Sequence, residues 1–260
     1  MCASGNLLPW FQRWGHVDGK DSTMFCFPCA GGSPMMFASW GNVLVETSVY
    51  SALLPGRGTR LREPPVASMR TLVPQLATAL TKHCNGPFMF FGHSMGALVA
   101  FEVARELQRR LAATPSALFV FGTGAPHFPT LLPPMSGLPV DEFRIRLRDL
   151  NGTPNEVLKN AELFTLLLPS MRGDFELVES YQYQHGPPLL CPIVALGGNQ
   201  DPETAGERLT EWRAHTKAWF QYRRFEGDHF FPFKNESVFL DHMRVEIQLA
   251  LCRTNVGIGG

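Results

Sequence analysis

The chain of 260 residues is 45% hydrophobic, and its 23 Lys and Arg are balanced by 23 Asp and Glu. This balance excludes the strong basic field that draws proteins to nucleic acid or to an anionic membrane, so we expect neither as a partner. No apolar run approaches the roughly 18 residues of a membrane span, and the N-terminus lacks the pattern of a signal peptide, so we expect a cytoplasmic protein. The length predicts one domain, residues 1–260, and we expect a monomer.

Six cysteines show no regular disulfide framework, and we expect free thiols at Cys2, Cys26, Cys29, Cys84, Cys191 and Cys252. Cys26 and Cys29 form a C-x-x-C pair, which is typical of redox and metal motifs. Here the pair lies at the end of an apolar run and leads into a Gly-Gly turn rather than a helix, and no second ligand pair follows. We therefore expect neither a redox role nor a bound metal.

Short apolar runs bounded by Gly or Pro alternate with helical patterns along most of the chain. In chain order, the sequence predicts strands at 24–27 and 49–53, a helix at 69–83, a strand at 88–91, a helix at 95–111, strands at 117–121 and 193–196, a helix at 205–215, a strand at 218–222 and a helix at 237–251. Strands that are apolar throughout are typical of a parallel sheet covered on both faces. The predicted class is α/β, with a mostly parallel central sheet flanked by helices.

The alternation of strand and helix stops near residue 124 and resumes near residue 190. The intervening segment, 125–189, is rich in proline at first and then helical. A long insertion with its own amphipathic helices, at the edge where catalytic loops lie, predicts a lid over an active site on a core formed by 1–124 and 190–260. A second structural subdomain is the alternative interpretation.

An apolar strand, the pattern G-H-S-M-G at 92–96 and a helix-forming stretch follow one another directly. G-x-S-x-G between a strand and a helix is typical of the nucleophile turn of α/β-hydrolases, in which glycines let the strained backbone pass close to its neighbours. The turn exposes the serine hydroxyl near the positive end of the following helix. The sequence therefore predicts Ser94 as a nucleophile.

A serine nucleophile needs a base, and the base needs an acid that orients it, in the chain order Ser, acid, His. His229 follows the last predicted strand, whereas His93, beside the serine, is expected to point away from it. Asp201 follows a strand and a Gly-Gly turn at the right place in this order, and Asp228 and Asp174 are weaker candidates for the acid. The predicted triad is Ser94, Asp201 and His229.

The tetrahedral oxyanion of acyl transfer needs two preorganised N–H donors. One is expected to be the backbone N–H of Met95, directly after the nucleophile. The other is expected from the turn F-P-C-A-G-G-S at 27–33, where glycines let the backbone approach a substrate. We predict Ala30 N–H as this second donor, with Cys29 as the adjacent alternative.

With these motifs, the chain resembles the type II thioesterases of polyketide and nonribosomal peptide synthases. The resemblance covers nearly the whole chain and includes L-P-G-R-G at 54–58, L-N-G-T-P at 150–154, the stretch 162–175, which ends in L-P-S-M-R-G-D-F, and G-D-H-F-F at 227–231. The family usually has a histidine or an aromatic residue in place of Cys29. We expect catalysis to survive this change and the wall of the acyl pocket to differ.

The resemblance implies hydrolysis of acyl groups from the phosphopantetheine arm of acyl or peptidyl carrier proteins, which removes stalled or aberrant acyl units from a synthase. The carrier protein is then the partner, the phosphopantetheine belongs to the substrate, and no cofactor is needed. The alternatives are a fatty-acyl carrier protein thioesterase of fatty acid synthesis and a carboxylesterase with the same triad. A macrocyclising thioesterase and a non-catalytic binding protein of this fold are weaker alternatives.

Apolar side chains near the oxyanion turn and in the insertion are candidates for the acyl pocket, although a role in the core explains them equally well: Cys29, Met35, Met36, Phe37, Phe143, Leu147 and Leu150. Carrier proteins of the family are acidic, so exposed arginines are candidates for docking. Arg144 and Arg148 share a predicted helix face, and Arg57, Arg60 and Arg62 cluster after a strand. An ordinary solvated surface is the alternative for both sets of arginines.

Overall fold

The computed structural model describes residues 10–15, 20–81, 84 and 86–256. Within them, a seven-stranded sheet runs in the order β1-β3-β2-β4-β5-β6-β7. Its strands are β1 (Phe11–Trp14), β2 (Ser22–Phe27), β3 (Thr47–Ala52), β4 (Phe88–His93), β5 (Ala117–Phe121), β6 (Ile193–Gly198) and β7 (Phe220–Phe225). Neighbouring strands are parallel except β1 and β3, which are antiparallel. The predicted α/β class with a mostly parallel sheet is confirmed.

Helices cover both faces of the sheet because its strands present apolar side chains on both sides. On β2, Phe25 and Phe27 belong to the core under α2 (Met69–Thr81) and α3 (Met95–Arg109), whereas Met24 and Cys26 belong to the core under α1 (Trp40–Val43) and α8 (Glu236–Val256). The short α7 (Phe231–Lys234) precedes α8. None of the helices in the described part of the chain is long and apolar enough to cross a membrane.

The structure differs from the sequence prediction at β1 and at 205–215, besides the unpredicted short helices α1 and α7 and the later bounds of β7. The sequence does not predict β1, because four residues of mixed polarity are too short to distinguish from a loop; the strand forms by pairing with the edge of β3. The helix predicted at 205–215 is wrong, since this segment forms short 3₁₀ turns at Gly206–Arg208 and Thr210–His215. Ala205 is extended and Gly206 has a φ of +56°, so the backbone leaves the α-helical region there.

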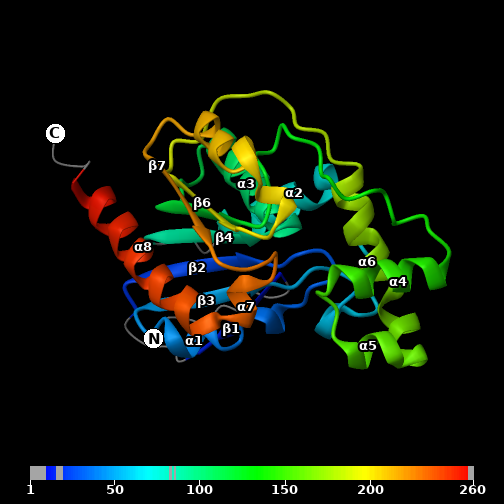
Figure 1. The fold of residues 1–260 in the computed structure, drawn as a ribbon. Coiled ribbons are helices and arrows are strands. Elements are labelled where there is room, and N and C mark those ends of the chain that lie inside the picture. Colours follow the sequence, from blue (N-terminus) through cyan, green and yellow to red (C-terminus); the bar gives the residue numbers. More distant parts are fainter. Residues whose placement is uncertain (1–9, 16–19, 82–83, 85, 257–260) are drawn as a thin grey trace.

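The insertion 125–189 contains α4 (Val140–Leu150), α5 (Asn155–Lys159) and α6 (Ala161–Glu179), which form a group at one end of the molecule, with α8 at the other (Figure 1). These helices have a small apolar core of their own, which includes Phe143, Leu158 and Phe164. The stretches 125–139 and 181–188, which join them to the sheet, contain no helix or strand. The insertion is therefore a helical unit attached to the sheet by two irregular connections.

A buried ion pair joins this insertion to the rest of the chain. Arg57, in the loop after β3, donates from Nη1 and Nη2 to the two carboxylate oxygens of Asp174 in α6, at 2.8 and 2.6 Å. Side-chain exposure is only 6% for Arg57 and 3% for Asp174. Asp174 also accepts from the N–H of Gly31 at 2.8 Å, and Arg57 donates to the carbonyl oxygen of Gly32 at 2.7 Å. The pair thereby fixes α6 against the turn at 27–33.

This geometry shows that the prediction of Arg57 and Arg60 as docking residues is wrong. Arg60 is also buried: it donates to the carbonyl oxygen of Leu53 at 3.0 Å, and its guanidinium lies over the ring of Trp10 at 4.0 Å. Of the predicted cluster, Arg62 alone is exposed. The loop after β3 packs against the insertion. Arg57 and Arg60, which the sequence pattern left as candidates for the surface, therefore bind carbonyl and carboxylate oxygens inside the protein.

Replacing Arg57 should be costly because it leaves the Asp174 carboxylate buried without its counter-ion. We expect Arg57→Ala to lower the free energy of unfolding by about 3–5 kcal/mol, measured by urea denaturation. The matched control is Arg62→Ala, whose exposed side chain should contribute less than about 0.5 kcal/mol. Equal stability of the two variants would contradict the role given to the ion pair.

Cys26, Cys29, Cys84, Cys191 and Cys252 are free thiols, as predicted, and Cys2 lies outside the described residues. Burial raises the pKa of Cys29 and of Cys191 to about 12, and raises that of Cys26 well above its usual value. Cys252 is exposed.

Because the thiolate is the reactive form, iodoacetamide at about pH 8 should modify Cys252 and spare Cys26, Cys29 and Cys191 in the native protein. Peptide mass spectrometry reads each site separately, and rapid modification of Cys29 would refute its burial.

Candidate active site

Ser94 occupies a strained turn between β4 and α3. Its φ of +56° with a ψ of −118° lies in a region that costs a residue with a side chain on the order of 1–3 kcal/mol. The turn is held by a hydrogen bond from the N–H of Ser94 to the carbonyl oxygen of Phe121 in β5, at 2.7 Å. The Ser94 side chain makes no capping bond to α3, and the residue lines a cavity. The hydroxyl is thus left for chemistry rather than for the helix.

Two glycines make this turn possible because backbone passes too close for any side chain. A Cβ on Gly96 would lie 2.0 Å from the carbonyl oxygen of Phe27, and a Cβ on Gly92 would lie 2.4 Å from the Cα of Ala97. Both neighbours are backbone atoms, which cannot rotate aside. Steric contact therefore explains the glycine at each end of the G-x-S-x-G pattern.

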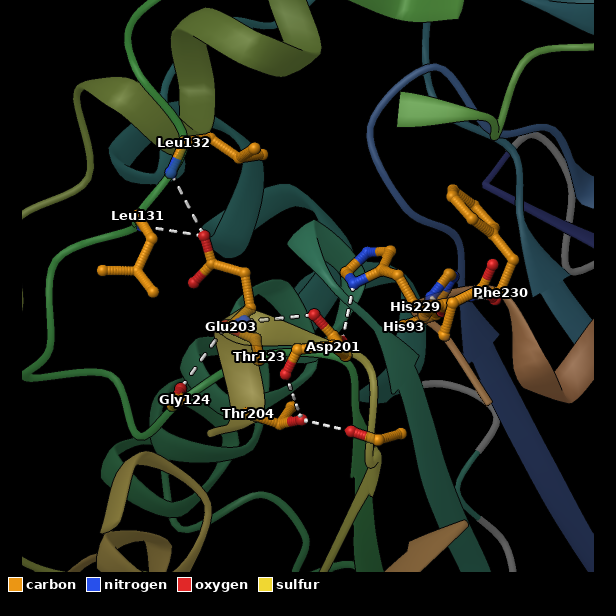
Figure 2. A network of polar contacts seen from close by, with 12 residues as sticks. His93, Thr123, Gly124, Leu131, Leu132, Asp201, Glu203, Thr204, His229 and Phe230 are labelled. Atoms are coloured by element: carbon orange, nitrogen blue, oxygen red, sulfur yellow. Dashed lines mark hydrogen bonds and ion pairs between the residues drawn. The ribbon is translucent and has the colours of Figure 1, made fainter. Parts of the chain in front are cut away.

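Asp201 and His229 are joined by a hydrogen bond of 2.8 Å between Oδ2 and Nδ1 (Figure 2). Asp201 follows β6 and His229 follows β7, so parallel strands bring them to one edge of the sheet. The Asp201 carboxylate is buried, and its Oδ1 accepts from the N–H of Glu203 at 3.1 Å. Because a carboxylate only accepts, Nδ1 of His229 carries a proton, and in the neutral ring the lone pair is then on Nε2. This is the form of histidine that can act as a base.

The His229 ring lies beside the serine turn, at the end of β5. Gly122 follows Phe121, whose carbonyl oxygen binds the N–H of Ser94, and a Cβ on Gly122 would lie 3.1 Å from Cε1 of His229. Gly122, with a φ of +72°, leaves room for the imidazole next to the turn. Ser94, Asp201 and His229 thus follow β4, β6 and β7 at the same edge of the sheet.

His93 is fully buried and holds the backbone of His229. Its Nε2 donates to the carbonyl oxygen of His229 at 2.8 Å. Burial, and secondly the neighbouring His229, hold the pKa of His93 well below its usual value, so its ring is neutral. Asp228, the weaker candidate for the acid, instead accepts from the N–H of Phe230 and pairs with Lys234. The other weaker candidate, Asp174, is engaged by Arg57.

The two predicted oxyanion donors border the same cavity as Ser94. Met95 begins α3, so its N–H is one of the groups that have no partner within the helix. In the turn at 27–33, the N–H of Gly31 donates to Asp174 and the N–H of Gly32 donates to the carbonyl oxygen of Cys29. Ala30 lines the cavity and Cys29 does not, which favours Ala30 over Cys29 as the second donor.

The cavity beside Ser94 has a volume of about 330 Å³, and the insertion supplies much of its wall. From the core come Ala30, Ser94, Met95 and Leu98. Further lining residues come from the stretch 122–133, from 175–185 and from the loop after β6: Thr123, Pro126, His127, Phe128, Pro129, Thr130, Leu132, Pro133, Phe175, Val178, Glu179, Tyr181, Gln182, Tyr183, His185, Glu203 and Arg208.

The side chains predicted for the acyl pocket lie elsewhere, so that prediction is wrong for this cavity. Phe37 packs on Trp40, under the opposite face of the sheet from α3. Phe143 packs on Phe175 inside the insertion, where Leu147 and Leu150 also contribute to the apolar core. Met35 is exposed, and the sulfur atoms of Cys29 and Met36 contact each other at 3.9 Å. The interpretation of these side chains as core holds for all except Met35.

Sequence reasoning missed the lining residues that follow β5. The available signal was the proline-rich stretch itself, because it directly follows a strand whose carboxyl end lies at the site, where α/β proteins bind ligands.

His127 lines the cavity, and its Nδ1 lies 2.9 Å from Nε2 of His215. Burial, and then the charges of His127, Arg105 and His185, lower the pKa of His215 to about 4. In the ranges that the structure describes, no group of three or more His, Cys, Asp or Glu is arranged to hold a metal ion.

The close contact at Gly96 gives a direct test of the turn. We expect Gly96→Ala to destabilise the protein by several kcal/mol, roughly 3 or more, because the added methyl group overlaps backbone that cannot move. The control is Gly137→Ala, in the exposed start of the insertion, where a Cβ meets nothing within 4 Å. Thermal unfolding followed by circular dichroism compares the two, and a Gly96→Ala variant as stable as Gly137→Ala would refute the close contact.

Known proteins of similar sequence and structure include thioesterases. The thioesterase domain family matches residues 22–245. The gramicidin S biosynthesis protein GrsT of Aneurinibacillus migulanus is 37% identical over 243 residues, which cover 93% of this chain and 95% of that protein. The type II thioesterase BorB from the borrelidin biosynthetic cluster superposes with a TM-score of 0.83 at 32% identity, covering 90% of this chain and 96% of BorB.

A further relative, linear gramicidin dehydrogenase LgrE of Brevibacillus parabrevis, is 43% identical over 212 residues, covering 80% of this chain and 81% of that protein. The dehydrogenase activity in that name is a property of LgrE. The G-T-G at 122–124 that follows β5 lacks the third glycine and the helix of a dinucleotide-binding turn. On the match over most of its length, and in agreement with the arrangement of Ser94, Asp201 and His229, the chain belongs to the thioesterase family.

Proposed function

We propose that this thioesterase hydrolyses acyl groups from the phosphopantetheine arm of carrier proteins, with Ser94 as nucleophile, His229 as base and Asp201 as the acid that orients the base. The observation that carries the proposal is the 2.8 Å Asp201–His229 hydrogen bond beside a strained serine turn that borders a cavity. The names of the relatives support the carrier-bound substrate, since GrsT is named for gramicidin S biosynthesis and BorB for the borrelidin cluster.

The proposed reaction has two halves that use the same groups. Ser94 Oγ attacks the thioester carbonyl carbon while its proton passes to Nε2 of His229, and the oxyanion accepts from the N–H groups of Met95 and Ala30. The C–S bond then breaks, the thiol leaves with the proton from His229, and the acyl group stays on Ser94. Water attacks this ester as His229 takes its proton, and the carboxylic acid leaves as Ser94 is re-formed. No cofactor takes part, because the phosphopantetheine enters and leaves with the substrate.

The cavity supports an acyl chain as the bound group. Its volume of about 330 Å³ is at the lower end of the range for small-molecule sites, and Leu98, Phe128, Leu132 and Phe175 supply apolar wall. The same wall contains polar groups such as His127. Acyl groups with an apolar body therefore fit the lining best.

Asp201→Asn tests the orienting role of the acid. The amide can hold the ring but stabilises neither the Nδ1–H form nor the imidazolium, so we expect kcat to fall by about 10³–10⁴-fold with little change in stability. The rate is measured with an acyl-pantetheine thioester, and folding with circular dichroism. A loss of less than about tenfold would exclude Asp201 as the orienting acid.

The proposed substrate class is tested by mass spectrometry of a panel of acyl-phosphopantetheinyl carrier proteins. The wild type should remove the acyl groups, Ser94→Ala should leave them in place, and a matched oxygen ester should be cleaved more slowly. If the carriers stay loaded while the oxygen ester is cleaved, the carboxylesterase alternative is correct. Preference for long saturated acyl groups on a fatty-acid carrier would favour the fatty acid synthesis alternative.

We also propose that α4 contacts the carrier protein. Ile145 and Arg148 are exposed and three residues apart, so they share one face of α4, whereas Arg144 is half-buried with its guanidinium over Phe164 at 4.3 Å. An exposed apolar and cationic pair fits an acidic partner. Of the two arginines that the sequence prediction placed on this helix, Arg148 therefore remains the docking candidate.

Arg148→Glu should raise KM for an acyl-carrier protein by roughly three- to tenfold, because it repels an acidic partner. The same variant should leave KM for an acyl-pantetheine unchanged. The matched control is Lys217→Glu, an exposed residue before β7 and so at the opposite edge of the sheet from the site. Equal effects of Arg148→Glu on both substrates, or a similar effect of Lys217→Glu, would rule out docking at α4.

A further inference from the structure

The carboxylate of Glu203 joins the loop of Asp201 to the wall of the cavity. Its Oε1 accepts from the N–H groups of Leu131 and Leu132 at 2.7 and 3.2 Å (Figure 2). The same oxygen accepts from Thr130 Oγ1 at 2.8 Å. The backbone N–H of Glu203 donates to Oδ1 of Asp201 at 3.1 Å. One residue therefore binds both the acid that holds His229 and the stretch that lines the cavity.

Arg208 completes this contact. Glu203 is only 7% exposed, and a carboxylate so buried needs a counter-ion. Arg208 supplies it from Nη2 at 3.0 Å and also donates to the carbonyl oxygen of Pro129 at 2.7 Å. The cavity wall is thus held through both its N–H and its C=O groups, and by residues of the loop that carries Asp201.

A second carboxylate holds the next part of the same stretch but lies in the insertion. Glu179, at the end of α6, accepts from the N–H groups of Met135 and Ser136 at 2.7 and 3.0 Å. The stretch 129–138 contains no helix or strand, so these side chains provide bonds that regular structure would otherwise supply. Among the described contacts, Glu203 binds Asp201 and Glu179 does not.

We propose that Glu203 is a positioning residue of the reaction, which keeps Asp201 aligned with His229 by anchoring the Asp201 loop to the cavity wall at 129–132. The proposal rests on the proposed triad. Asp201 is followed by a single 3₁₀ turn, Pro202–Thr204, which is closed by a bond from the N–H of Thr204 to the carbonyl oxygen of Asp201 at 3.2 Å. The side chain of Glu203 ties this turn to the cavity wall through Thr130 and Leu131. An acyl group packed against Leu132 then supports the same wall that fixes the acid.

The test compares kcat and KM of three alanine variants with acetyl-pantetheine, which is too short to reach far along the cavity, and with octanoyl-pantetheine. Glu203→Ala should lower kcat by about 10- to 100-fold for both thioesters, since a misplacement near 1 Å is enough for such a loss. Glu179→Ala should mainly raise KM for the octanoyl thioester. Glu207→Ala, an exposed side chain four residues along the chain, is the matched control and should behave as the wild type.

Two further variants separate positioning from folding. Glu203→Gln retains an oxygen that can accept from Leu131 and Leu132, so it should recover most of the kcat lost in Glu203→Ala. Thr130→Val removes one donor to Glu203 from a half-buried site and should lower kcat by roughly two- to fivefold even if Glu203→Ala does not fold. Circular dichroism and thermal unfolding show which variants are folded.

The outcomes distinguish this proposal from the proposed function. If the wild type cleaves neither thioester, or if Ser94→Ala is equally active, the proposed function fails. If the wild type is active and Ser94→Ala is not, but Glu203→Ala and Thr130→Val change only KM or change nothing, Glu203 is part of the wall alone and the positioning role is overturned. A Glu203→Gln variant as impaired as Glu203→Ala would also contradict anchoring through the accepted hydrogen bonds.

Discussion

The Arg57–Asp174 ion pair is the contact on which the arrangement of insertion, sheet and oxyanion turn depends. Desolvating two charges is expensive, and such a pair persists only when further hydrogen bonds satisfy it. Here the bidentate contact is supplemented by the N–H of Gly31 and the carbonyl oxygen of Gly32. The insertion therefore does more than cover the cavity. Its helix α6 supports the turn that contains Ala30.

Backbone groups hold the three residues of the proposed triad in place. The N–H of Ser94 binds the carbonyl oxygen of Phe121, the ring of His93 binds the carbonyl oxygen of His229, and the N–H of Glu203 binds Asp201. The contacts to Ser94 and His229 come from neighbouring elements, whereas the contact to Asp201 comes from its own loop. A strained serine turn persists in this setting because the surrounding structure fixes it on several sides.

Local signals were sufficient to predict six of the seven strands, all except β1. Ser94, Asp201 and His229 were chosen on the same kind of signal, an apolar strand followed by a turn in the adjacent sequence. The cavity wall could not be predicted in this way because it depends on which distant segments meet. Phe37 and Phe143 are apolar and near the motifs in the sequence, yet they face other cores. The sequence around Arg57 does not reveal that its side chain is buried, because its partner, Asp174, lies 117 residues further along the chain.

The motifs on which the family resemblance rests have a physical explanation in the contacts that they make. In L-P-G-R-G, Arg57 binds Asp174, and a Cβ on Gly56 would lie 3.0 Å from Cβ of Ser170, both partners being in the 162–175 motif. In L-N-G-T-P, a Cβ on Gly152 would lie 2.1 Å from the ring of Phe230, the neighbour of His229. These motifs thus meet one another, or the base, where the insertion contacts the core. They therefore help to fix how the insertion packs against the core beside the proposed triad.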